Sequence, residues 1–390
     1  MPLCYHARRF VYRRGREDTG AAKLLAGPCH WHYAMSMNKD YALVDKAFEP
    51  LLKAAAGNVQ VLLKLAEQSR FRGDLNRAIE LAQQAKEAAP DNPEVVTTAQ
   101  EIISRAVPNW HVPMINDLER NDAFEAAIVR AIEPGLRVLD VGAGTGLLAM
   151  MAARAGAESI WSCELNPAMA TVAQKIVRAN GFADQIKIIA KNSRDVDADA
   201  DMGGLADLVV AEILGSDLVC EHVLPAMRDV VQRLAKPGAT LIPQSGDIRV
   251  ALAFWDGLDK RQMPNTSGFD LSHFNTLLPT SYKVERGNSG LHLRGAATNL
   301  FSFNFADTQI PNERATAALI SDGGRVNGVG QWIRLQLDAE GELENQPAPG
   351  ATSSWACIFY PLPEAIDTVP GQAVQIAATH NGNRLRLWAA

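Results

Sequence analysis

Between residues 137 and 242 the chain alternates between short apolar runs and amphipathic segments, and this alternation restricts the fold more than any other feature. The apolar runs predict strands at residues 137–140, 159–164, 186–190 and 208–212. The segments between and after them predict helices at residues 147–155, 167–180 and 223–235, followed by a turn into a further strand at residues 236–242. Strands that alternate with helices form a parallel, doubly wound sheet. Residues 107–242 therefore predict an α/β domain with a Rossmann-like sheet, preceded by an amphipathic helix at residues 116–132.

After Pro243 the pattern changes to short alternating segments without a helical period. These segments lie at residues 291–294, 301–305, 332–337, 355–360, 373–378 and 385–388. Short strands separated by Gly, Asn and Pro predict an all-β second domain at residues 243–390. Residues 255–282 are rich in Asp, Pro and Asn, which indicates an insertion rather than a strand.

Residues 38–106 have a helical period. Apolar and small residues recur with the spacing of a tetratricopeptide repeat, at Leu62, Leu65, Ala66, Ala78, Ala82, Ala85 and Pro90. Small residues at these positions let two antiparallel helices pack closely, here with a turn at residues 72–74 and a further helix at residues 93–105. A helical brace on the next domain and a docking surface for a protein partner both agree with this pattern.

The first 37 residues contain several arginines and no apolar period, which predicts a disordered tail. An organelle transit peptide and a true start at Met35 or Met37 remain alternatives, whereas the apolar core of a secretory signal is absent. A short cluster of Cys29, His30 and His32 contains metal-ligand residue types, but it is too small to predict a metal site.

The composition is that of an ordinary globular protein, with 47% hydrophobic and 21% charged residues. A net charge of −6 provides no basic field for nucleic acid, so no nucleic-acid partner is expected. The five cysteines form no Cys-x-x-Cys pair and no run of eighteen apolar residues occurs, which predicts a cytoplasmic protein with no membrane span and no metal.

A glycine-rich loop follows the first predicted strand. Gly142, Gly144 and Gly146 form a G-x-G-x-G pattern directly after a strand that ends at Asp140. Glycine lets the backbone approach a ligand closely, and the next helix presents free N–H groups. Dinucleotide-binding loops place the third glycine one residue later. Together with Glu164 at the end of the next strand, where a carboxylate accepts ribose hydroxyls, the loop favours S-adenosyl-L-methionine as the cofactor.

Two glutamates, Glu212 and Glu221, stand nine residues apart after the predicted strand at 208–212. The loop between them can fold back as a hairpin, which would turn both carboxylates toward one pocket. Two such carboxylates repel each other unless a cation lies between them or one takes a proton. A guanidinium, with several N–H donors, is a suitable cation. As an alternative, Glu221 simply stabilises the N-terminus of the following helix.

Because of the glycine loop and the two glutamates, residues 107–390 resemble the protein arginine N-methyltransferase family. The segment from Glu212 through Gly215 to Glu221 matches the double-glutamate loop of the family, and residues 138–146 match its cofactor loop. The resemblance implies S-adenosylmethionine-dependent methylation of arginine in protein substrates, with both glutamates holding the guanidinium. It also implies that the second domain is a β-barrel and that residues 255–282 form a dimerisation arm, so a homodimer is expected.

Further positions follow from the resemblance. Arg120 is expected to bind the cofactor carboxylate and Ser193 to contact adenine, whereas Met114 and Trp355 are expected to bind substrate. Bulk near Met114 and Val223 differs between family members that add different numbers of methyl groups, and the sequence leaves that number open. Residues 191–196 and 268–274 are most similar to the seven and nine branches, and the nine branch also carries tetratricopeptide repeats.

Two departures from the family pattern qualify these expectations. The Thr-His-Trp loop of the family reads Ser353-Ser354-Trp355 here, so a histidine is missing. The seven and nine branches hold two tandem catalytic modules, whereas this chain holds one. The alternatives are a methyltransferase that acts on another protein side chain or a small molecule, and a weakly active adaptor whose helical repeats bind partners.

Overall fold

The computed structural model describes residues 57–106, 110–284, 290–310, 313–348, 350–351 and 353–390. The predicted tail at residues 1–37 lies outside the described residues, together with Cys29, His30, His32 and residues 38–56 of the helical segment.

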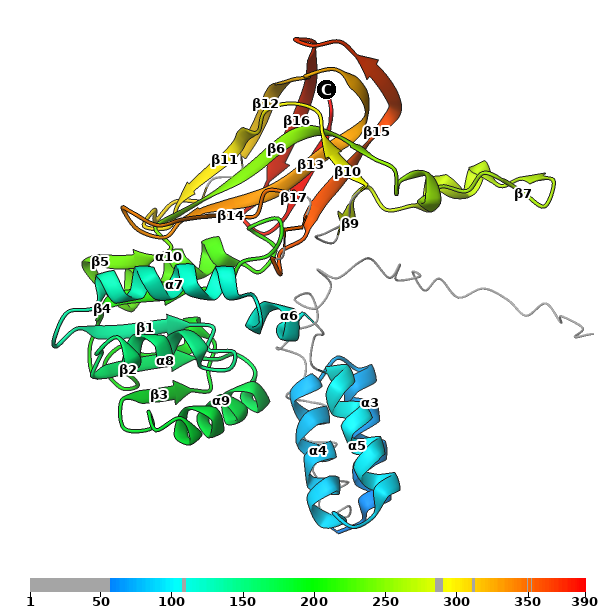
Figure 1. Ribbon diagram of the computed structural model, residues 1–390. Helices are drawn as coiled ribbons and strands as arrows, with labels where there is room; N and C mark the ends of the chain where they lie inside the picture. The colour runs from blue at the N-terminus through cyan, green and yellow to red at the C-terminus, as the bar shows by residue number, and fades with distance from the viewer. Residues whose placement is uncertain (1–56, 107–109, 285–289, 311–312, 349, 352) are drawn as a thin grey trace, which may run out of the picture.

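Three antiparallel helices form the N-terminal part of the described chain: α3 (Val59–Phe71), α4 (Leu75–Ala88) and α5 (Pro93–Ala106). The turn between α3 and α4 uses Gly73 with φ +83°, and Asp74 caps α4 by accepting a hydrogen bond from the Arg77 N–H. Ala66, Ala78, Ala82 and Ala85 are all fully buried between the helices. The predicted helices and their turn are confirmed, whereas the tetratricopeptide identity stays a prediction. This bundle lies to one side of the other two parts of the chain (Figure 1).

The middle part is a five-stranded parallel sheet with strand order β3-β2-β1-β4-β5. Its strands are β1 (Arg137–Val141), β2 (Ser159–Cys163), β3 (Ile186–Ile189), β4 (Ala206–Ala211) and β5 (Ala235–Ile242). Its helices are α6 (His111–Ile115), α7 (Leu118–Ala131), α8 (Leu147–Arg154), α9 (Pro167–Ala179) and α10 (Val223–Arg233), with a short 3₁₀ turn η2 (Ser193–Asp195). Fully buried Val138, Leu139, Leu208 and Val209 place the core on the two central strands. The predicted doubly wound sheet is confirmed.

Two local expectations in this domain hold apart from their exact bounds. The helix expected at residues 116–132 is α7, which starts at Leu118 because Asp117 has non-helical backbone angles and caps the helix through a 3.2 Å hydrogen bond from the Arg120 N–H. The turn expected between Lys236 and the last strand lies inside β5: Ala235 pairs with Ala206 and Thr240 with Leu208, so the residues between them leave the ladder, and Gly238 has φ +78°. The sequence did not predict α6, the short helix that ends before Asp117.

The C-terminal part is an antiparallel β domain, as expected, and it stands on the side of the α/β domain that carries α7 and α10 (Figure 1). The larger sheet contains β6 (Ser245–Trp255), β9 (Tyr282–Val284), β10 (Leu291–Leu293), β11 (Thr298–Asn304), β13 (Gly324–Gln336), β14 (Glu342–Glu344) and β15 (Cys357–Thr368). The smaller sheet contains β12 (Glu313–Ile320), β16 (Ala373–His380) and β17 (Leu385–Ala389). The sequence did not predict β6, because residues 250–253 of this central strand are all buried and do not alternate.

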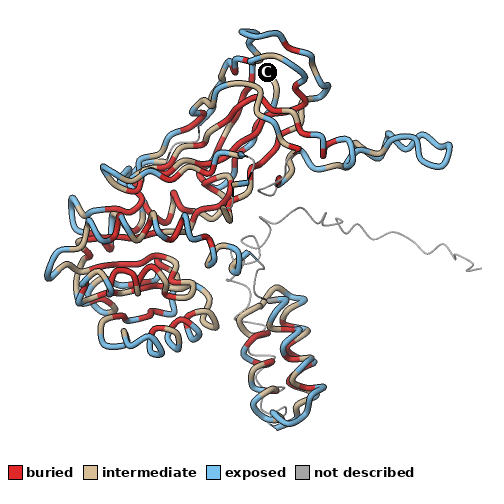
Figure 2. Tube along the Cα trace, viewed as in Figure 1, coloured by how far each residue is buried: buried red, intermediate tan, exposed pale blue. Residues whose placement is uncertain are grey.

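An extended excursion joins β6 to β9 and projects away from the β domain (Figure 1). It contains η3 (Asp259–Arg261), β7 (Asn265–Thr266), β8 (Phe269–Asp270) and η4 (Ser272–Leu277), and Figure 2 shows that its outer part is exposed. Four of its apolar side chains are 42% to 70% exposed, namely Phe269, Leu271, Phe274 and Leu277. We call residues 256–281 the arm. Exposed apolar residues gathered on one projecting element are typical of a surface that binds another protein.

Among the described residues, no helix has the length and hydropathy needed to cross a membrane.

Candidate active site

The glycine-rich loop and the two glutamates lie at the point where the strand order of the parallel sheet reverses. Strands β1 and β4 are direct neighbours, with Val141 paired to Ala211 at their carboxyl ends. The chain continues from β1 into the glycine loop and from β4 into Glu212. Open α/β sheets bind ligands in the crevice at this position, where the connections leave in opposite directions.

The glycine loop requires glycine for two separate reasons. Gly142, Gly144 and Gly146 have φ values of +88°, +52° and +80°, which are strained for any residue with a Cβ. A Cβ on Gly142 would also stand 2.5 Å from Cγ2 of Ile213, the residue after Glu212. The two loops are therefore in van der Waals contact, and a ligand over one of them is close to the other.

Two acidic side chains line the loop from neighbouring strands. The Glu164 carboxylate accepts hydrogen bonds from the N–H groups of Gly144 and Asn166, at 2.9 and 2.8 Å, and burial raises its pKa. Asp140 is 1% exposed and accepts a 2.6 Å hydrogen bond from the Ser162 hydroxyl. Burial raises the pKa of Asp140 to about 6, and its Oδ1 has no hydrogen-bond partner among the described residues. An unpaired buried acceptor is unfavourable, so this oxygen fits a donor supplied by a ligand.

Glu212 forms a buried ion pair with Arg120 of α7. Their side chains are 4% and 5% exposed, and Nη2 of Arg120 donates to Oε2 of Glu212. Nη1 of Arg120 donates to Oδ1 of Asn121, whereas Nε is buried without a partner among the described residues. Burial raises the pKa of Glu212, and the positive charge of Arg120 opposes that rise. This ion pair thus connects Arg120, which is expected to bind the cofactor, to Glu212, which is expected to bind the substrate.

Residues 212–221, which we call the glutamate loop, fold back on themselves through a bridge between Gly215 and Leu218. The predicted hairpin is confirmed. A Cβ on Gly215 would stand 2.1 Å from Sγ of Cys220, so any larger residue here requires the Cys220 side chain to move, and Cγ of Glu221 would lie 3.6 Å away. Leu218 in the loop has a φ value of +69°, and His222, the first residue after the loop, has a φ value of +62°. Strained backbone of this kind is found mainly at functional sites, where the surrounding structure holds it in place.

The segment Ser353-Ser354-Trp355 contacts both the glutamate loop and the start of α7. The indole N–H of Trp355 donates to the carbonyl oxygen of Leu214 at 2.9 Å, and the ring is 6% exposed. The backbone N–H of Ser354 donates to Oδ2 of Asp117 at 2.6 Å. Ser354 stands where the family has a histidine, and here the main chain makes the contact to Asp117. Sequence reasoning missed Asp117, although an aspartate directly before a helical run is an N-cap signal.

The remaining predicted positions occupy the same edge of the sheet or its neighbourhood. Ser193 is buried in η2, which follows β3, and its carbonyl oxygen accepts a 3.1 Å hydrogen bond from Arg233. Met114 is half-buried in α6, and Val223 is the buried first residue of α10, directly after the glutamate loop.

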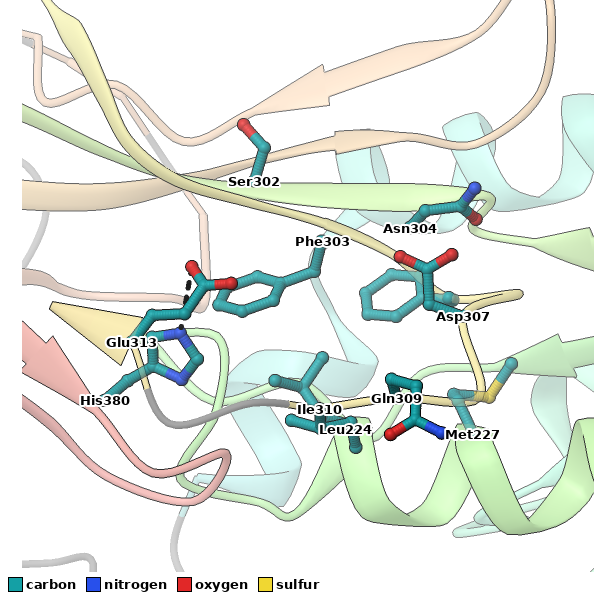
Figure 3. Close-up of a pocket in the computed structure, with 11 residues that line it drawn as sticks. Leu224, Met227, Ser302, Phe303, Asn304, Asp307, Gln309, Ile310, Glu313 and His380 are labelled. Carbon is teal, nitrogen blue, oxygen red and sulfur yellow. Dashed lines mark ion pairs between the residues drawn. The ribbon is translucent and has the colours of Figure 1, made fainter. Parts of the chain in front are cut away.

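A separate cavity of about 60 Å³ lies between α10 and the β domain (Figure 3). Figure 3 labels His380 and Glu313 on one side of it, where Nε2 of His380 lies 3.7 Å from Oε2 of Glu313. Burial lowers the pKa of His380. The cavity is lined by none of the sequence-predicted site residues, so the crevice at the ends of β1 and β4 remains the candidate site.

Comparison with known proteins identifies the family. The model of the ribosomal protein L11 methyltransferase (PrmA) family matches residues 123–250. A protein of Streptomyces achromogenes subsp. streptozoticus named arginine N(omega)-methyltransferase is 34% identical over 279 residues, which cover 71% of this chain and 77% of that protein. This chain belongs to the arginine N-methyltransferase family. It is therefore a methyltransferase enzyme.

Other members of the family match a smaller share of their own length. The protein arginine N-methyltransferase 7 of Drosophila grimshawi is 32% identical over 265 residues, which are 60% of this chain and 37% of that protein. The rice protein of the same name is 26% identical over 70% of this chain and 43% of its own length. The chain thus spans well under half of these relatives.

Two solved structures of arginine methyltransferases have the same fold. The structure titled as the Trypanosoma brucei PRMT1 enzyme-prozyme heterotetrameric complex with AdoHcy aligns with a TM-score of 0.62 at 22% identity, covering 72% of this chain and 91% of that one. Arabidopsis thaliana protein arginine methyltransferase 10 aligns with a TM-score of 0.60 at 19% identity, covering 70% and 90%. These neighbours support the arginine methyltransferase fold, in which a Rossmann-like sheet precedes a β domain.

Proposed function

We propose that this chain transfers a methyl group from S-adenosylmethionine to a terminal guanidino nitrogen of arginine, with Glu212 and Glu221 holding the guanidinium. The buried pair between Glu212 and Arg120 carries the proposal, because one carboxylate of the glutamate loop already binds a guanidinium. This ion pair lies beside the glycine loop, at the point where the strand order of the parallel sheet reverses. A site that binds one guanidinium edge with a buried carboxylate has the chemistry to bind a second with Glu221.

The residues around the glycine loop fit S-adenosylmethionine, which supplies an electrophilic methyl group on a sulfonium. The unpaired Nε of Arg120 suits the cofactor carboxylate, and the unpaired Oδ1 of Asp140 suits a donor such as its ammonium group. The Glu164 carboxylate accepts two backbone bonds and retains lone pairs for ribose hydroxyls. The backbone of Gly142, Gly144 and Gly146, together with Ser193, completes the proposed cofactor contacts.

Both carboxylates orient and polarise the substrate. A guanidinium spreads its charge over three nitrogens, which makes each of them a poor nucleophile. Carboxylates bonded to two of the nitrogens concentrate positive charge there and leave the lone pair of the third more available. Holding that nitrogen in line with the methyl group then supplies a large part of the rate enhancement. At the moment of transfer the methylated nitrogen carries an additional positive charge and is far more acidic than the guanidinium, so it releases its proton to solvent after transfer and no base needs to act before it.

The substrate is arginine within a protein, or arginine as a free small molecule. Relatives named protein arginine N-methyltransferase favour the first. The Streptomyces relative, of which this chain covers 77%, is named arginine N(omega)-methyltransferase without reference to a protein, which favours the second. Met114 and Trp355 are the proposed pocket walls in either case, and the number of methyl groups added depends on the space that they leave.

We also propose that the arm contacts a second copy of the chain, forming a homodimer. Its exposed apolar side chains support this assembly. We propose in addition that the three-helix bundle α3–α5, with its tetratricopeptide-like spacing, recruits a protein partner. A pull-down that gives the same partners with and without residues 57–106 would contradict that role.

The role of the two carboxylates is tested by Glu221→Gln and Glu212→Gln. Glutamine keeps the shape but removes the charge, so each variant should lose methyl transfer by about a hundredfold or more, as is usual when a charge-stabilising group is removed. Glu221→Gln should leave the dissociation constant of S-adenosylhomocysteine within about twofold, because no cofactor contact is assigned to it. Glu212→Gln should also weaken cofactor binding, because Arg120 loses its partner.

Glu119→Gln is the matched control, since Glu119 is an exposed glutamate adjacent to Arg120. It should leave both quantities unchanged. Wild-type rates of methyl transfer in both Glu212→Gln and Glu221→Gln would contradict the claim that these two residues hold the guanidinium.

A further inference from the structure

We propose that Gln331 is a positioning residue that fixes the glutamate loop to the β domain and thereby sets the placement of Glu212 and Glu221; this inference rests on the proposed function. Gln331 lies in β13 and is fully buried. Its Nε2 donates to the carbonyl oxygen of Ser216 at 3.1 Å and to that of Trp332 at 3.0 Å. Ser216 stands near the middle of the glutamate loop, 115 residues away in sequence.

The neighbours of the Gln331 amide determine its orientation. Both groups that it contacts are carbonyl oxygens, which accept hydrogen bonds and cannot donate them. Reversing the amide would therefore bring its oxygen against two acceptors. In the orientation that remains, Oε1 is buried and has no hydrogen-bond partner among the described residues. An unpaired buried acceptor destabilises the folded state, so the favourable contribution of Gln331 comes from the two hydrogen bonds that its Nε2 donates.

The hydrogen bond from Gln331 Nε2 goes to a part of the glutamate loop whose backbone is strained. Ser216 lies two residues before Leu218, whose backbone has φ +69°. The Ser216 hydroxyl accepts a 3.1 Å hydrogen bond from the N–H of Ala356, and the preceding Leu214 carbonyl is bonded to Trp355. The β domain thus forms hydrogen bonds to three polar atoms of the glutamate loop, and Gln331 donates the one to the Ser216 carbonyl. Strained backbone persists only where its surroundings over-determine it.

The kinetic consequence is specific. The cofactor contacts proposed above come from α7, β1, the loops that follow β1 and β2, and η2, which all lie outside the glutamate loop, and Arg120 of α7 is bonded to that loop through Glu212. In a looser loop the distance and angle between the two carboxylates and the methyl group would vary, and small misplacements of this kind reduce the rate of the transfer step. Loss of Gln331 should therefore lower kcat, and it should weaken cofactor binding no more than loss of the Glu212 carboxylate does.

The test is Gln331→Met, which keeps the length of the side chain and removes its donors. We expect kcat for methyl transfer to arginine to fall by about tenfold to a hundredfold, while the dissociation constant of S-adenosylhomocysteine rises no more than it does in Glu212→Gln. Amide hydrogen exchange should become faster in residues 213–221. This second readout needs no turnover, so it still tests the role of Gln331 if the wild-type chain methylates no arginine and the proposed function itself fails.

Asn327→Leu is the matched control. Asn327 is a second buried amide in β13, 4% exposed, whose side chain bonds the backbone N–H and carbonyl of Trp255 at 2.8 and 2.9 Å inside the β domain. This variant should lower the thermal midpoint and leave both kcat of the folded enzyme and exchange in residues 213–221 unchanged. A folded Gln331→Met enzyme with wild-type kcat and wild-type exchange would overturn the proposal, as would equal changes in the control.

Gln331→Glu keeps the inference testable if the methionine variant does not fold. A buried carboxyl without a cationic partner has a raised pKa, and its protonated form can donate one O–H to the Ser216 carbonyl. As pH rises the carboxyl ionises and repels that oxygen. The ratio of variant to wild-type kcat should therefore fall with rising pH, whereas a ratio independent of pH would contradict the role given to Gln331.

Discussion

At the scale of single residues, the site contains a guanidinium that belongs to the protein itself. Arg120 was expected from the sequence to bind the cofactor, and Glu212 to bind the substrate. Their buried ion pair connects the two expectations, because a change in either residue alters the electrostatics of both halves of the site. The backbone N–H of Ser354 bonds to Asp117, which caps the helix that carries Arg120.

Gly215 provides a test of the geometry of the glutamate loop at this scale. In Gly215→Ala the new Cβ would stand 2.1 Å from Sγ of Cys220, so the Cys220 side chain and the turn that carries it must shift. We expect methyl transfer to fall by about a hundredfold, since displacement of a reacting or orienting group by about 1 Å has that effect. The affinity for S-adenosylhomocysteine should fall much less. Both quantities can be measured on the purified variant.

Gly330→Ala is the control, because a Cβ there meets nothing closer than 3.5 Å in the β domain. It should retain wild-type activity. Equal activity of both alanine variants would mean that the close packing at Gly215 does not position the glutamates.

At the scale of secondary-structure elements, the sequence predicted the parallel sheet well because each buried strand is a short apolar run between helical segments. It did not predict α6, since this helix has only five residues, too few to show a helical period. Strand β6 was missed although residues 245–250 alternate, because residues 250–253 are buried at consecutive positions and end the alternation. The arm was recognised from its polar composition, but its exposed apolar side chains become evident only in the structure.

The arm predicts the oligomeric state. Replacing Phe269 and Leu277, both 70% exposed, by serine should leave the fold intact, because neither side chain packs in a core. If the arm joins two copies, the double variant should sediment as a monomer under conditions where the wild-type chain is a dimer. Phe71→Ser on α3, where the ring is 76% exposed, is the control and should not change the state. A dimer that survives the arm substitutions would place the interface elsewhere.

At the scale of the whole molecule, the site is completed by contacts between parts of the chain that are more than 100 residues apart. Trp355 bonds to Leu214 and Gln331 bonds to Ser216, so the β domain holds the loop that the α/β domain presents. The residue types at the site could be predicted from spacing and from the resemblance, because glycines and strand-end carboxylates have local causes. The support from Gln331 could not, since a lone glutamine in a β strand has no pattern that indicates its partner.

The central claim is that the carboxylates of the glutamate loop present arginine for methylation, and the position of a transferred label tests it most directly. The purified chain is incubated with S-adenosylmethionine labelled in its methyl group, once with free arginine and once with an arginine-containing peptide, and the products are identified by amino-acid analysis. The account predicts label on a terminal guanidino nitrogen of arginine in at least one of the two, and their ratio distinguishes the free from the protein-bound substrate. Label on another side chain, or no transfer to either substrate from a chain that binds the cofactor, would contradict it.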